Sequence, residues 1–324
     1  MVSVVLWVML FVLCSSAEAQ QPRRVARIGY LDNGTAADSA ELLDAFRKQM
    51  TQLDWIEGKN LTIEYRYADR NLDRLSELAL ELVRLKPDAI VGNNTETSVA
   101  IKKATSTIPI VMIASTDPVG NGLIASLGRP GGNVTGNSGF ADELAGKRLE
   151  ILKETISKFT RVGVITGLLG PGGYSQLKGI KEAASALGLK LVVTDSASDD
   201  EKLLNAFQSM VREHVDGIIT TSGPGIFVRR KNIILLAANY KLPAMYPSKG
   251  FAEEGGLMSY GNDTRENDRR AAVYVDKILR GAKPGDLPVE RPSKFEFVVN
   301  LKTAKQIGLT IPPTVLYRAD KVIK

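Results

Sequence analysis

The sequence predicts an α/β protein of two doubly wound lobes, each built on a parallel sheet and joined by several chain crossings that act as a hinge. Three observations support this prediction. At 324 residues the chain is long enough to bury two cores. Short apolar strands alternate with amphipathic helices, which is the pattern of parallel sheets covered on both faces. The same pattern then occurs a second time at nearly constant spacing.

An internal repeat divides the chain into two similar halves. Each half begins with an apolar strand, 27–31 or 161–165, and continues with a helix whose apolar residues have helical spacing, 42–53 or 177–187. The later strands follow in the same order in both halves. They are predicted at 61–65 and 189–193, at 88–91 and 216–219, and at 108–111 and 242–245.

The C-terminal part of the chain is expected to contribute one segment to each lobe. We predict a first lobe of residues 25–140 plus 262–290 and a second lobe of residues 141–261 plus 291–324. The Gly-rich segment 128–136 lacks the Lys-Ser/Thr ending of a phosphate loop and is interpreted as a turn on the hinge side. The tail holds a predicted helix at 265–280, a strand at 295–299 and a short helix at 301–307.

Residues 1–19 are predicted to be a signal peptide, because an apolar run is followed by a small-x-small site before Gln20. No basic residue precedes the run, which leaves open a true start further upstream. Cys14 is the only cysteine. It is interpreted as part of the leader, since Leu13 is not the small residue expected before a lipid-modified cysteine. The mature chain therefore has no disulfide and no thiolate nucleophile.

Composition argues against several classes of function. The net charge of +6 is spread over the chain without a basic-aromatic stripe, so no nucleic acid partner is expected. His214 is the sole histidine and has no predicted serine or carboxylate partner. With one histidine and no mature cysteine, neither a catalytic triad nor a transition-metal site is expected. We expect no cofactor and no enzymatic activity.

The loops that follow the repeated strands should border one cleft, because ligands bind outside the carboxyl ends of parallel strands. These loops are rich in hydroxyls, amides and glycines, which suit reversible binding. The candidate ligand contacts are Asp32, Asn33, Asn94, Thr95, Asp117, Tyr174, Thr221, Ser222, Tyr246 and Tyr260. The two aspartates could pair with a ligand ammonium, and the tyrosines could give flat walls. Each residue also has a structural alternative, as a turn, a helix cap or half-buried packing.

Several motifs resemble one known family. They are Gly58-Lys59-Asn60-Leu61, Asp117-Pro118-Val119-Gly120, Arg129 to Gly136, Gly255 to Gly261, and the ending from Lys294 to Pro312. They resemble the bacterial ABC transporter substrate-binding proteins that include tryptophan- and tyrosine-binding members. The resemblance covers Arg24 to Lys324 and implies a periplasmic-binding-protein-like fold of type I. The family's ligand contacts map onto Asn33, Asn94, Thr95, Asp117, Ser138, Thr221, Ser222 and Tyr246.

The resemblance implies an extracytoplasmic solute-binding component of an ABC importer, which binds a small polar ligand such as an amino acid by hinge closure. It further implies a periplasmic location, an ABC permease of the inner membrane as partner, and a monomer. A ligand-sensing module for a membrane receptor remains an alternative, and a periplasmic enzyme is a less favoured one. The chain departs from the family pattern in two cleft loops, 92–95 and 168–173.

Overall fold

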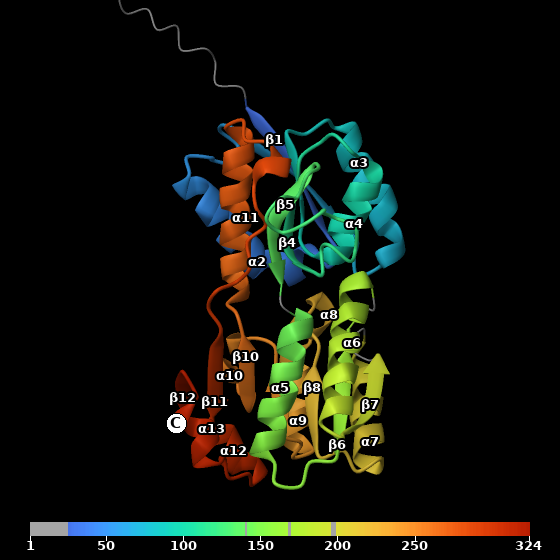
Figure 1. The fold of residues 1–324 in the computed structure, drawn as a ribbon, viewed down its shortest axis with the longest axis vertical. Coiled ribbons are helices and arrows are strands. Elements are labelled where there is room, and N and C mark those ends of the chain that lie inside the picture. Colours follow the sequence, from blue (N-terminus) through green and yellow to red (C-terminus); the bar gives the residue numbers. More distant parts are fainter. Residues whose placement is uncertain (1–24, 140, 168–169, 196–198) are drawn as a thin grey trace, which may run out of the picture.

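The computed structural model describes residues 25–139, 141–167, 170–195 and 199–324. The predicted leader, residues 1–19, lies outside the described residues, as do Leu168 and Leu169 of one predicted cleft loop. Figure 1 shows two lobes arranged along the long axis of the molecule.

The first lobe contains a parallel sheet and the helices that cover it. Its elements are β1 (Ala26–Asp32), α2 (Ala36–Gln52), β2 (Leu61–Tyr67), η2 (Leu72–Arg74), α3 (Leu75–Arg84), β3 (Ala89–Gly92), α4 (Thr95–Ala104), β4 (Ile110–Thr116) and β5 (Val134–Gly139), joined later in the chain by α11 (Thr264–Leu279) and η3 (Pro284–Asp286). Within the described ranges the sheet has five strands in the order β2-β1-β3-β4-β5, and all neighbours are parallel.

The second lobe is built in the same way. Its elements are α5 (Ala141–Thr155), β6 (Arg161–Thr166), α6 (Pro171–Ala186), β7 (Lys190–Asp195), α7 (Asp200–Arg212), β8 (Gly217–Thr220), α8 (Pro224–Val228), α9 (Arg230–Asn239), β9 (Ala244–Tyr246), α10 (Lys249–Glu253), β10 (Met258–Gly261), β11 (Glu296–Asn300), α12 (Leu301–Ile307), α13 (Pro313–Tyr317) and β12 (Lys321–Ile323). The described strands form one sheet in the order β12-β11-β10-β9-β8-β6-β7.

The two sheets repeat one strand order. Read from the outer edge, β7-β6-β8-β9-β10 of the second lobe matches β2-β1-β3-β4-β5 of the first. The pairings along these strands are parallel, whereas β11 runs antiparallel to β10 and extends the second sheet. The predicted fold class is confirmed, and the repeat extends one strand further in each lobe than the sequence indicated.

Both sheets are buried on both faces, as the continuous apolar strands require. In β1, Tyr30 and Leu31 point to opposite faces because side chains alternate along a strand. Tyr30 lies in one core with Phe46 of α2 and Val275 of α11, and Leu31 lies in another with residues of α3 and α4. The second lobe has the same layers, with α5 and α6 over one face of the sheet and α7 and α9 over the other.

The chain passes between the lobes after β5, after β10 and again before β11. Helix α11 packs along α2 in the first lobe, as Figure 1 shows, although it follows a strand of the second. At the crossings, the Ser138 N–H donates to the Glu290 carbonyl at 2.9 Å. The Lys249 ammonium lies 3.2 Å from Glu296 and 3.5 Å from Asp263, so it holds two of the crossings together.

The Gly-rich segment 128–136 is only partly the turn that we predicted, because β5 begins at Val134. Gly136 has φ of 129°, and a Cβ there would lie 2.2 Å from the Met112 carbonyl oxygen. Glycine therefore allows β5 to approach β4 closely in a conformation that other residues avoid. The turn interpretation therefore holds for residues 128–133 and fails for Gly136, which belongs to a buried strand.

Candidate functional site

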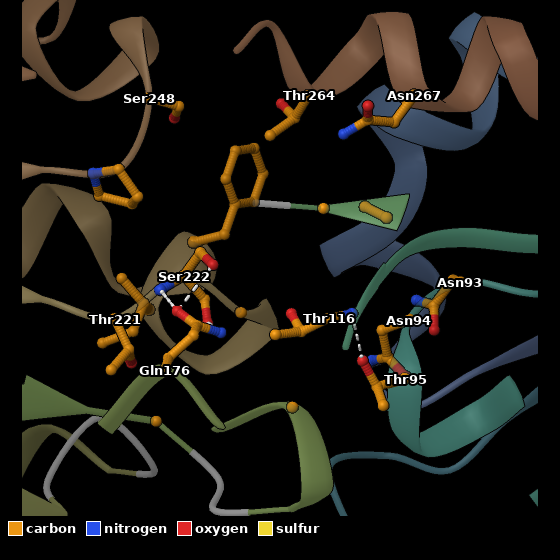
Figure 2. A pocket seen from close by; sticks show the side chains of 18 of the residues that line it. Asn93, Asn94, Thr95, Thr116, Gln176, Thr221, Ser222, Ser248, Thr264 and Asn267 are labelled. Carbon is orange, nitrogen blue, oxygen red and sulfur yellow. Dashed lines mark hydrogen bonds between the residues drawn. The ribbon is translucent and has the colours of Figure 1, made fainter. Parts of the chain in front are cut away.

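A cavity of about 210 Å³ lies between the lobes, at the carboxyl ends of the strands of both sheets. Figure 2 shows polar side chains from the two lobes on its walls. The first lobe contributes Asn33, Asp38, Ser39, Leu42, Asn93, Asn94, Thr95, Glu96, Ile113, Ala114, Thr116, Gly139, Asn262, Thr264, Asn267 and Asp268. The second contributes Leu144, Arg148, Gly167, Gly172, Gly173, Gln176, Thr221, Ser222, Gly223, Gly225, Ile226, Phe227, Pro247, Ser248 and Phe251.

Five of the candidate contacts line this cavity, namely Asn33, Asn94, Thr95, Thr221 and Ser222. Asn94 also caps α4, because its Oδ1 accepts the Thr97 N–H at 3.0 Å. The Thr95 hydroxyl accepts the Thr116 N–H at 2.9 Å, a bond drawn in Figure 2. The loop of Asn94 and Thr95 therefore both caps α4 and lines the cavity.

The two candidate aspartates do not line the cavity. Asp32 is fully buried behind it, where its carboxylate accepts the Gly34 N–H at 2.7 Å and the Ser39 hydroxyl at 2.5 Å. Asp117 has φ of 43° and accepts the Gly120 N–H at 2.9 Å, so its carboxylate closes a turn.

The other four candidates also lie away from the cavity wall. Ser138 is buried in β5, opposite Ser115 of β4. Tyr246 is 1% exposed and stacks on Phe251 with ring centroids 5.0 Å apart, whereas Tyr174 is 60% exposed on α6. Tyr260 packs between two phenylalanines of the β11 region. The structural alternative of packing describes Tyr246 and Tyr260, whereas the ring of Tyr174 is exposed.

The aromatic and apolar part of the wall comes from other residues. Phe227 of α8 and Phe251 of α10 line the cavity in the second lobe. Leu42, Ile113 and Leu144 add apolar surface from α2, β4 and α5. The cavity thus combines hydrogen-bonding groups with an apolar wall, as small-molecule sites usually do.

Two buried acids, Asp32 and Asp268, belong to the first lobe at this cavity. Burial raises the pKa of Asp32 to about 6, although its hydrogen bonds to Ser39 and Gly34 oppose the shift. Asp268 of α11 lines the cavity, and burial together with the nearby Asp32 raises its pKa well above the ordinary range. Each carboxylate is thus costly to ionise in the absence of a cation.

Arg148 of α5 is the buried cation of the second-lobe wall. Its Nε donates to the Tyr260 carbonyl at 2.6 Å and its Nη2 to the Pro247 carbonyl at 3.2 Å. Burial lowers the pKa of this guanidinium to about 10, so the group still carries its charge at neutral pH. These two bonds fix the guanidinium where β9 and β10 end.

The lobes touch each other at one edge of the cleft through Glu96 of α4. Its carboxylate accepts the Gly172 N–H at the start of α6, at 2.9 Å. The two lobes approach so closely there that a Cβ on Gly172 would lie 2.9 Å from the Thr95 hydroxyl oxygen. Burial raises the pKa of Glu96, and the N–H groups of Gly172 and Gly173 oppose that shift.

Two buried polar atoms of the wall have no hydrogen-bond partner within the described residues, the Asn33 Oδ1 and the Asn94 Nδ2. By contrast, Gln176 is occupied, because its Oε1 accepts both the N–H and the hydroxyl of Ser222, as drawn in Figure 2. An unpaired buried acceptor and an unpaired buried donor are groups that a ligand could satisfy.

Our inspection of loops missed Arg148 and Asp268 because both lie on helices. A signal is nevertheless present in the sequence. Asp268 stands in the apolar stripe of α11 with Ala271, Ala272 and Val275, and Arg148 stands beside Ala145 and Leu149 of α5. A charged residue in the buried stripe of a helix is uncommon and would have marked both positions.

The remaining structure offers little further chemistry. His214 is exposed after α7 and does not line the cavity. Across the described ranges, no three histidine, cysteine or acidic side chains come together as a metal site would require. No helix in the described part of the chain is long and apolar enough to cross a membrane.

Comparison with known proteins matches this chain to one family over nearly its whole length. A tyrosine-binding protein of Clostridioides difficile is 28% identical over 265 residues, which is 82% of this chain and 75% of that protein. Among solved structures, a conserved domain protein of Vibrio cholerae is 29% identical, with a TM-score of 0.83 over 92% of this chain and 100% of that one.

An ABC domain of Streptococcus pneumonia in complex with L-Trp is 25% identical, with a TM-score of 0.80 over 92% of this chain and 99% of that one. The family model described as ABC transporter substrate binding protein matches residues 37–323. This match confirms the resemblance found in the sequence motifs. The chain belongs to the ABC transporter substrate-binding protein family.

Proposed function

We propose that this protein is the extracytoplasmic solute-binding component of an ABC importer and that it holds an amino acid in the cavity between its lobes. The observation that carries the proposal is the cavity itself, whose hydrogen-bonding and apolar wall is shared between two lobes. A site divided in this way is complete only when the lobes approach, so ligand binding favours the closed arrangement. A permease of the inner membrane would then recognise that arrangement.

The choice of an amino acid is supported by the relatives. One of them is a tyrosine-binding protein and another was solved with L-Trp. Phe227 and Phe251 on the wall are suited to pack against an apolar or aromatic side chain.

The proposed contacts are the five sequence candidates that line the cavity, with Arg148, Asn267 and Asp268 added. We propose lobes of residues 25–140 with 262–290 and of residues 141–261 with 291–324, which follows the division of the strands between the two sheets. Export is proposed from the leader at residues 1–19 and from membership of the family.

The proposal is tested by identifying the ligand. Mass spectrometry of small molecules released from the purified protein should find an amino acid. Protein freed of that molecule by unfolding and refolding should then gain thermal stability when the same compound is added, since a ligand that binds only the folded state raises the unfolding temperature. Conversion of the compound to a product during incubation would contradict a transport role and favour an enzyme.

A further inference from the structure

The cavity wall carries an unneutralised positive charge on the second lobe. Arg148 is 3% exposed, and its hydrogen-bond partners are the backbone carbonyls of Tyr260 and Pro247. In the part of the chain that the structure describes, no carboxylate lies within ion-pair distance of this guanidinium. Carbonyl dipoles orient the group but do not cancel its charge, and a buried unpaired charge is costly.

The opposite wall carries a buried acid that lacks a cationic partner on the first lobe. Asp268 is also 3% exposed and lines the cavity, and among the described residues its carboxylate has no ion pair and no hydrogen bond with another residue. Its neighbour Asp32 has the same sign of charge. Arg269 is the nearby cation on the same helix, but its guanidinium pairs with Glu266 at 2.9 Å.

The guanidinium of Arg148 and the carboxyl group of Asp268 do not pair with each other. Arg148 comes from α5 of the second lobe and Asp268 from α11 of the first, and neither is among the groups that shift the pKa of the other. Both nevertheless border the same cavity. Each wall therefore lacks a partner that a molecule placed between the lobes could supply.

We propose that the ligand is a zwitterion held across the cleft, with its ammonium group at Asp268 of the first lobe and its carboxylate at Arg148 of the second. This inference rests on the proposed function and adds to it the charge pattern and the orientation of the ligand. An ammonium group has three donors. The Asn33 Oδ1, which is buried without a partner on the same lobe, would accept one that Asp268 leaves free.

Selectivity follows from the division of charge. A molecule without the carboxylate would bury Arg148 unpaired when the lobes close, and a molecule without the ammonium would do the same to Asp268. Truncation of one partner of a buried charge pair usually weakens binding by about 100-fold or more. Only a ligand with both charges neutralises both walls in the closed state.

The test uses matched compounds that differ in one charge. Calorimetry would measure L-tyrosine, tyramine and 3-(4-hydroxyphenyl)propionate against refolded protein, with L-tryptophan, tryptamine and indole-3-propionate as the second set. We expect at least one of the amino acids to bind and its two analogues to bind about 100-fold or more weakly. An analogue that binds within about threefold of its amino acid would overturn the inference, because both charges are expected to contribute to binding.

Two variants assign the charges to the two lobes. Arg148→Met should reduce the preference for the amino acid over the amine and leave its preference over the deaminated acid. Asp268→Asn should reduce the preference for the amino acid over the deaminated acid and leave its preference over the amine. Each preference is the ratio of two affinities measured with the same variant. A general loss of stability weakens both affinities and therefore does not change this ratio. If both variants lose the two preferences equally, the assignment to separate lobes is wrong.

Neighbouring charges on the same helices serve as controls. Lys147→Met removes an exposed charge that pairs with Glu150 beside Arg148, and Glu266→Gln does so near Asp268. Both controls should keep the two preferences. Should Arg148→Met fail to fold, Arg148→Lys retains the charge and should retain the preference over the amine.

The outcomes separate this inference from the proposed function. Closure around a neutral sugar would contradict the zwitterion and leave solute binding intact. If neither probe amino acid binds and the copurified compound carries only one charge, the inference is overturned in the same way. If a zwitterion binds but is turned over, the proposed transport role fails while the charge assignment stands.

Discussion

The two lobes share one strand order but present different helix starts to the cleft. In the first lobe, α2 begins with a capping box formed by Thr35 and Asp38, and α4 with one formed by Asn94 and Thr97. These side chains satisfy the free N–H groups of their own helices. The first-lobe helices are thus complete before any ligand arrives.

The equivalent helices of the second lobe begin at glycines. Helix α6 starts after Gly170 and α8 after Gly223, and neither has a side-chain cap. The first lobe supplies the missing acceptor for α6, since Glu96 accepts the Gly172 N–H. The apolar strands of the repeat thus give both lobes the same topology. The helix starts at the cleft differ, because those of the first lobe are capped by their own side chains and α6 of the second lobe is capped by a residue of the first.

The largest expected effect concerns the buried acid behind the first-lobe wall. The pKa of Asp32 rises from its ordinary 3.8 to about 6 on folding, so the folded state binds the proton more tightly. The contribution of Asp32 to the free energy of unfolding is therefore largest below about pH 4 and falls by about 3 kcal/mol as the pH rises through about 6.

Urea unfolding of ligand-free protein near pH 4 and pH 7 would measure this loss. Asp32→Asn should remove the part of the loss that comes from Asp32, whereas the raised pKa values of Asp268 and Glu96 leave a loss of the same sign in the variant. Acids with lowered pKa values, such as Asp216, lose their contribution only as the pH falls below the ordinary value, outside this window. An equal pH dependence in variant and wild type would contradict the burial of this carboxylate.

The next effect tests how closely the lobes approach. Gly172→Val places side-chain atoms where Thr95 and Glu96 of the other lobe lie, because even a Cβ would be 2.9 Å from the Thr95 hydroxyl oxygen. We expect ligand affinity to fall by about 1 to 3 kcal/mol, the usual cost of overpacking, with little change in the stability of the ligand-free protein.

Gly250→Ala is the control for this substitution, since an added Cβ there meets nothing within 4 Å. Calorimetry with the copurified ligand should give wild-type affinity for the control. Wild-type affinity for Gly172→Val as well would mean that the bound state does not bring α4 and α6 together.

A smaller effect on ligand affinity is expected at Glu96, where two substitutions distinguish the role of its hydrogen bond from the role of its charge. Glu96→Ala leaves the Gly172 N–H buried without an acceptor in the closed state, which should cost about 1 to 3 kcal/mol of ligand affinity. Glu96→Gln retains an acceptor and should stay nearer to wild type. Glu182→Ala, an exposed acid of α6, provides the matched control. Equal losses in the Ala and Gln variants would show that charge, not the bond, is what matters.

The smallest effect is expected at a helix start that the first lobe completes by itself. Thr35→Ala removes the capping box of α2 and should lower the free energy of unfolding by about 1 kcal/mol. Ligand affinity of the folded protein should not change, because Thr35 does not line the cavity. A loss of affinity without a loss of stability would contradict this division of roles.

The sequence predicted the repeated strands and the cleft because both depend on apolar periodicity and on where parallel strands end. It predicted cavity residues best in the loops that directly follow strands, such as Asn33 and Thr221. It failed for Tyr246, whose ring is buried in the core beside Phe251. An aromatic residue at a strand end packs inward or outward according to neighbours that local sequence does not reveal.

The charged walls could not be predicted from the loops. Asp268 reaches the cavity only because α11 returns to the first lobe after the second has been completed. Arg148 lies on a helix that the internal repeat did not indicate. Both depend on tertiary arrangement, although their position in apolar helix stripes was visible in the sequence.

Small-angle X-ray scattering tests the central claim most directly, namely that a ligand joins two unlike walls by closing the lobes. The measurement compares refolded, ligand-free protein with the same protein saturated with the compound that copurifies. We predict a smaller radius of gyration in the saturated sample, and a weaker response at the same ligand concentration in Gly172→Val. An unchanged radius of gyration at saturation, with binding verified by calorimetry, would contradict closure.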